Sequence, residues 1–179
     1  MESPWKGCFQ MILPTAYCGP KSYFASLMSE PATIEVMESF EKQTFRNRCL
    51  IRDPKGEIIR LTVPVGKVEH KQLTRDIEIS YQSRWQHQHW IAIESAYRHK
   101  PYFIYFADYL KPFYEKEYKW LLDLNDGLTE TILSLLRRDR PRLASVSQAA
   151  RTEDWSGETW TDRHSWQKEL SVLDTLFDS

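Results

Sequence analysis

The stretch RNRCLIRDPKGEIIRLTVPV, residues 46–65, decides how this part of the chain folds. Both of its flanks are rich in β-branched and other strand-forming residues. Between them, the sequence DPKG at 53–56 has Asp, Pro and Gly at its first, second and fourth positions, where type I turns favour these residues. The stretch therefore predicts a β-hairpin.

Patterns on either side of the hairpin complete the predicted fold. A short apolar strand, a helix and an alternating strand precede it, at 10–13, 22–28 and 33–38, and these form a βαβ unit if the two strands are parallel. A further strand is expected at 76–80. Beyond it the apolar residues recur with helical period, and helices are predicted from residue 83 to Pro101, over 101–114, over 119–138 and over 170–177. The sequence thus predicts one α/β domain over 1–179, with a mixed sheet and helices drawn mostly from the C-terminal half.

Two arginines in the hairpin stretch are candidate ligand-binding residues. In an extended strand, Arg46 and Arg48 project from the same side, roughly 6.5–7 Å apart, which suits a grip on one phosphate or pyrophosphate. The alternative is a solvated strand face whose arginines pair with nearby glutamates. Asn47 faces the other way, where it serves either as a ligand or as a satisfied buried amide.

His89 and Tyr17 are the other candidate site residues. His89 lies in the middle of an apolar helix face, one turn after Trp85, and its ordinary pKa near 6.5 suits a general acid or base. A core histidine bonded to a carbonyl is the alternative. Tyr17 lies in the loop after the first strand, where open α/β sheets bind ligands, and otherwise caps the core. Cys18 in the same loop is a nucleophile only if a histidine or the helix end stabilises its thiolate.

Composition limits the possible functions. The net charge of −1 gives no long-range attraction to nucleic acid, and no run of about 18 apolar residues predicts a membrane span. The three cysteines have no metal-binding or disulfide spacing, and no Walker loop or dinucleotide fingerprint is present. We therefore expect a cytoplasmic protein without metal or cofactor that takes a phosphate-bearing small molecule. Aromatic residues make up 13% of the chain, which suits either a core or a glycan or nucleotide pocket.

An ordered series of motifs resembles the WbqC-like family from about Met11 to the end of the sequence. The motifs are Phe45-Arg46-Asn47-Arg48, Leu61-Thr62-Val63-Pro64-Val65, Tyr81 with Trp85 and His89, Lys100-Pro101-Tyr102-Phe103, Leu124-Asn125 and the tail at 170–177. The chain departs from the family pattern at Gly19 and Lys21 and over a diverged, shortened segment at about 144–168.

The resemblance implies a place in bacterial lipopolysaccharide and O-antigen biosynthesis. Glycine or acyl transfer is the activity it suggests, so the expected function is group transfer to a nucleotide-linked sugar or glycan intermediate. The alternative is a noncatalytic protein that binds a glycan or a partner in the same pathway.

Overall fold

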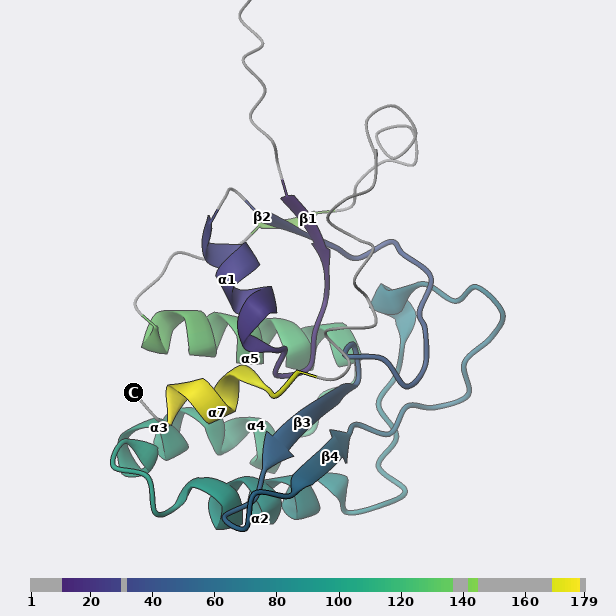
Figure 1. Cartoon of the computed structure of the whole chain (residues 1–179). Helices are drawn as coiled ribbons and strands as arrows, with labels where there is room; N and C mark the ends of the chain where they lie inside the picture. Colours follow the sequence, from purple (N-terminus) through teal and green to yellow (C-terminus); the bar gives the residue numbers. More distant parts are fainter. Residues whose placement is uncertain (1–10, 30–31, 137–141, 145–168, 178–179) are drawn as a thin grey trace, which may run out of the picture.

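The computed structural model describes residues 11–29, 32–136, 142–144 and 169–177. Figure 1 shows the course of the chain. The elements, in chain order, are β1 (Met11–Pro14), α1 (Lys21–Ser29), β2 (Ala32–Glu35), β3 (Arg48–Arg52), β4 (Ile58–Thr62), the 3-10 turn η1 (Thr74–Asp76), α2 (Trp85–Tyr97), α3 (Phe103–Leu110), α4 (Pro112–Glu115), α5 (Leu121–Leu135), β5 (Arg142–Ala144) and α7 (Val172–Leu176).

The predicted βαβ start is confirmed. Strands β1 and β2 are parallel, with Leu13 opposite Ile34, and α1 connects them and packs on both. The sequence did not predict β5, which pairs in parallel with the other edge of β2 and gives the strand order β1-β2-β5. The segment at 145–167, predicted to be a long surface segment, lies outside the described residues.

The predicted hairpin is also confirmed. Strands β3 and β4 are antiparallel, and the amide of Gly56 donates to the carbonyl of Asp53, which closes the turn. Gly56 has a φ of +88°, a left-handed conformation that glycine adopts without a steric penalty. The parallel and antiparallel strands divide between two sheets.

Two predicted elements differ in detail. The strand expected at 76–80 forms only isolated bridges, because this segment pairs with single residues on two sides: Glu78 with Trp120 and Ile79 with Val65. The helix expected at 101–114 divides into α3 and α4. Pro112, which lacks an amide hydrogen, is the first residue of α4.

Helices from the C-terminal half cover the hairpin and complete one hydrophobic core. Helix α2 packs on both hairpin strands, and α7 packs on β3 and α1 (Figure 1). The apolar stripe of α5 is buried as its spacing predicts, at Leu121, Leu124, Leu128 and Ile132. Within the described residues, no helix has both the length and the apolar character needed to cross a bilayer.

Candidate functional site

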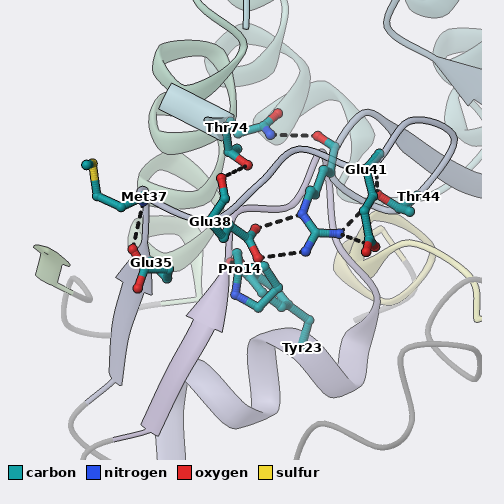
Figure 2. A network of polar contacts seen from close by, with 10 residues as sticks. Pro14, Tyr23, Glu35, Met37, Glu38, Glu41, Thr44 and Thr74 are labelled. Carbon is teal, nitrogen blue, oxygen red and sulfur yellow. Dashed lines mark hydrogen bonds and ion pairs between the residues drawn. The ribbon is translucent and has the colours of Figure 1, made fainter. Parts of the chain in front are cut away.

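Arg46 lies in a turn before β3, not in the strand, and its side chain is 1% exposed. Its Nε and Nη2 atoms each donate to a different carboxylate oxygen of Glu38, both at 2.7 Å (Figure 2). A third nitrogen, Nη1, lies 3.3 Å from Thr44 Oγ1 and 3.5 Å from Glu41 Oε2. Arg46 and Arg48 therefore do not form the predicted phosphate fork, because Glu38 occupies the guanidinium of Arg46.

The main chain around this ion pair is held by further hydrogen bonds. The Thr74 hydroxyl donates to the Glu38 carbonyl at 3.2 Å, and Asn125 Nδ2 on α5 donates to the Arg46 carbonyl at 2.8 Å. The network thus ties η1 and α5 to the segment that leads into β3.

The side-chain amide of Asn47 is buried, which agrees with the structural role that was the alternative to ligand binding. Its Nδ2 donates to the Val63 carbonyl at 3.0 Å, and its exposed fraction is 4%. Its Oδ1 has no hydrogen-bond partner among the residues that the structure describes. Half of the amide is therefore unsatisfied, and a ligand role for Asn47 stays a prediction.

Tyr17 and His89 meet in the core, 72 residues apart in sequence. The Tyr17 hydroxyl lies 2.8 Å from His89 Nδ1 and 3.0 Å from the Tyr114 hydroxyl. The ring of Trp85 contacts the His89 ring edge to face, with centroids 5.1 Å apart. Sequence analysis proposed Tyr17 and His89 separately and missed Tyr114, which lies on α4, 97 residues from Tyr17 in sequence.

Burial determines the protonation of this group. It lowers the pKa of His89 to about 4, an effect that a hydrogen bond to the backbone of Thr62 opposes. The Tyr17 hydroxyl bridges His89 Nδ1 and the Tyr114 hydroxyl, and either hydroxyl of the tyrosine pair can be the donor. Burial also raises the pKa of both tyrosines, so the whole chain of hydrogen bonds is neutral at cellular pH.

Two thiols adjoin the tyrosine chain. Cys18 Sγ lies 3.9 Å from the Tyr114 hydroxyl, and burial together with a hydrogen bond to Cys18 raises the pKa of Cys49. Cys18 has a φ of +42°, which is uncommon for a residue with a side chain and marks local strain in the loop after β1. Both cysteines are buried and free. The catalytic role predicted for His89 thus remains a prediction, and the structure encloses this residue with Tyr17, Cys18 and Tyr114 in the core.

The outer face of the hairpin carries an arginine pair that sequence analysis missed. Arg48 lies opposite Thr62 and Leu50 lies opposite Arg60, so Arg48 and Arg60 are diagonal neighbours on one face, with Cα atoms roughly 7–8 Å apart. Partial burial lowers the pKa of Arg48, and the charge of Arg60 lowers it further. Arg48 Nε donates to Thr62 Oγ1 at 3.3 Å. The turn at 53–56 fixes the strand register, which is the signal that could have placed Arg60 beside Arg48.

Neither arginine of this pair has an acidic partner among the described residues. The same part of the chain has no group of three or more histidine, cysteine or acidic side chains placed to hold a metal ion. The hairpin face is therefore the candidate functional site, and its two guanidinium groups are of the kind that can bind an anion.

Comparison with known proteins identifies one family. The model of the WbqC-like protein family matches residues 21–161. No curated protein and no solved structure matches the chain.

Proposed function

This chain belongs to the WbqC-like protein family, and from that premise we propose that it binds a phosphate-bearing intermediate of bacterial surface-polysaccharide assembly in the cytoplasm, without acting on it chemically. The observation that carries the binding proposal is the pair Arg48 and Arg60. Two guanidinium groups on one face of the hairpin repel each other, and the charge of Arg60 already disfavours the charged form of Arg48. A phosphate or pyrophosphate between them relieves that repulsion and accepts hydrogen bonds from both.

Burial favours binding over catalysis. His89 is 5% exposed, Cys18 is 2% exposed and Tyr17 is fully buried, so the residues best suited to acid–base or nucleophilic chemistry do not reach a ligand at the surface. The low pKa of His89 also leaves it a weak base at cellular pH.

Group transfer is the second candidate function. The chain of hydrogen bonds that links Tyr114, Tyr17 and His89 and the strained backbone of Cys18 favour it, because proton pathways and strain recur at active sites. Catalysis by these residues requires the loop around Cys18 to open.

Titration calorimetry with inorganic pyrophosphate and with uridine diphosphate tests the binding proposal. Arg60→Gln should lower the affinity of the chain for both probes by about tenfold or more, which corresponds to about 1.4 kcal/mol. Arg75→Gln, in an exposed ion pair with Asp76 on η1, is the matched control and should leave binding unchanged. The proposal is wrong if neither probe binds the wild-type chain at low salt, or if Arg60→Gln binds like wild type.

Mass spectrometry then separates the two functions. A nucleotide-linked sugar that binds is incubated with the chain and with a glycyl or acyl thioester, from which the thiol leaves when the acyl group is transferred to the sugar. If the mass of the nucleotide-linked sugar is unchanged, the result supports a binding protein. If its mass increases by that of the transferred group, the result supports group transfer.

A further inference from the structure

A cavity of about 580 Å³ lies between α3 and α5, apart from the residues discussed so far. Its lining consists of Ile104, Tyr105, Phe106, Asp108, Tyr109, Ser134 and Leu135. Three of the side chains on α3 are unusually exposed for their type, since Ile104 is 74%, Tyr105 69% and Tyr109 60% exposed. Solvated aromatic and aliphatic groups gathered at a hollow mark a binding site more often than isolated exposed residues do.

The helix geometry places the two tyrosines next to each other. Tyr105 and Tyr109 are four residues apart on α3, so they lie about one turn, or roughly 6 Å, along the same helix face. On a helical wheel, Asp108 falls between Ile104 and Tyr105. Across the cavity, α5 contributes the Ser134 hydroxyl and the apolar side chain of Leu135. The site therefore combines flat aromatic faces with a carboxylate and a hydroxyl.

The charges of the lining exclude several ligand classes. Among the described residues, the cavity lining includes no lysine or arginine, and the Asp108 carboxylate repels anions, so this lining suits a neutral ligand better than a phosphate. A purely apolar ligand, or the apolar surface of a protein, would bury the Asp108 carboxylate without a partner, which is costly. An organic cation calls for an enclosing cage, whereas these tyrosines share one face of one helix.

We propose that the cavity between α3 and α5 binds a neutral sugar ring. The C–H face of a pyranose stacks on the rings of Tyr105 and Tyr109, while its hydroxyls donate to Asp108 and exchange hydrogen bonds with Ser134. A sugar ring thus contacts the apolar and the polar side chains of the lining at the same time. This site is separate from the proposed phosphate site at Arg48 and Arg60 and stands without it.

The test uses ligand-observed NMR on the full chain with the methyl pyranosides of glucose, galactose and mannose as probes. We expect millimolar binding of at least one probe, which Tyr105→Ala weakens by about tenfold or more and Tyr105→Phe retains, since stacking needs the ring and not the hydroxyl. Asp108→Asn should weaken binding severalfold. Because these side chains are exposed, the variants should keep the wild-type fold, which circular dichroism checks. Ile91→Ala, a 50% exposed position on α2, is the apolar control.

Three outcomes overturn the proposal. The first is that none of the three glycosides binds, and the second is that Tyr105→Ala binds the glycoside as the wild type does. The third is binding of tetramethylammonium in place of sugar, which would assign the cavity to a cation. Arg60→Gln should leave glycoside binding unchanged. The glycoside experiment therefore tests the sugar site alone, and the pyrophosphate titration tests the phosphate site alone.

Discussion

Arg46 and Glu38 form a two-point ion pair inside the core, in which both Glu38 oxygens accept from one guanidinium at 2.7 Å. The pair joins the segment that follows β2 to the turn that precedes β3 (Figure 2). Charges this deeply buried persist only when they are matched in geometry and fully bonded. The guanidinium of Arg46 is therefore taken up by Glu38, whereas Arg48 and Arg60 have no acidic partner among the described residues.

The first prediction concerns this pair. Glu38→Gln keeps the size of the side chain but leaves the buried Arg46 guanidinium with only the more distant, exposed Glu41 as counter-charge, so the free energy of unfolding should fall by about 3–5 kcal/mol. Urea denaturation measures the change. Asp76→Asn, which breaks the exposed pair with Arg75, is the control and should cost less than about 1 kcal/mol. Equal, small effects of both substitutions would show that the core pair contributes no more than a surface pair.

The second prediction is an acid sensitivity that arises from His89. Its pKa of about 4 in the folded protein lies below the ordinary value near 6.5, so the unfolded state binds more protons between these two pH values. The free energy of unfolding should therefore fall as the pH drops through this window, by about 2–3 kcal/mol between about pH 7.5 and about pH 4.5 from this group alone. Denaturation curves at the two pH values measure the loss.

His89→Gln should remove that part of the pH dependence. Glutamine does not titrate, and it can accept from Tyr17 and donate to the Thr62 carbonyl. His87→Gln, at an exposed position on the same helix, should leave the pH dependence as in wild type. An unaltered acid response in His89→Gln would mean that His89 is not held neutral by burial.

The third prediction concerns Gly127, inside α5. Replacing glycine by alanine in a helix ordinarily stabilises by about 1 kcal/mol. Here the new methyl group would lie 2.6 Å from Cε1 of Phe113, whose ring stacks on Tyr118. We expect Gly127→Ala to destabilise the protein by about 1 kcal/mol, measured by thermal or urea denaturation.

The same substitution in a Phe113→Ala background provides the check. With the ring removed, alanine at 127 should stabilise the protein, and the coupling between the two positions should exceed about 1 kcal/mol. Additive effects would place the cost of Gly127→Ala elsewhere than at the Phe113 ring.

Local patterns predicted those parts of the fold that depend on neighbouring residues. The turn at 53–56 is determined by its own Asp, Pro and Gly residues, and the spacing of the apolar residues in α5 indicates which face is buried. The hairpin and this helix were therefore predicted from the sequence. Strand β5 has only three residues and gains its place by pairing with β2, more than a hundred residues earlier. Such a pairing leaves no local signal.

The candidate site shows the same limit. Arg46 is buried because Glu38 pairs with its side chain and because Asn125, 79 residues away, bonds to its main-chain carbonyl. The local sequence Arg-Asn-Arg indicates instead a strand in which both arginine side chains point to solvent. The chain from Tyr114 through Tyr17 to His89 joins three separate segments. Some side chains have the charge and spacing of functional residues but are buried in the core. Only the tertiary contacts show which ones these are.

Helix α7 closes the structure by bonding to segments from the first third of the chain. The Ser171 hydroxyl donates to the Cys18 carbonyl at 2.6 Å, the Ser171 amide donates to Leu50, and the Val172 amide donates to Gly19. Phe177 packs on Tyr97 with ring centroids 4.7 Å apart. During synthesis, the loop around Cys18 and the edge of β3 thus leave the ribosome long before the residues that satisfy their carbonyls. The native core can assemble only after translation has passed residue 177, and until then those carbonyls and apolar surfaces are open to water and to chaperones.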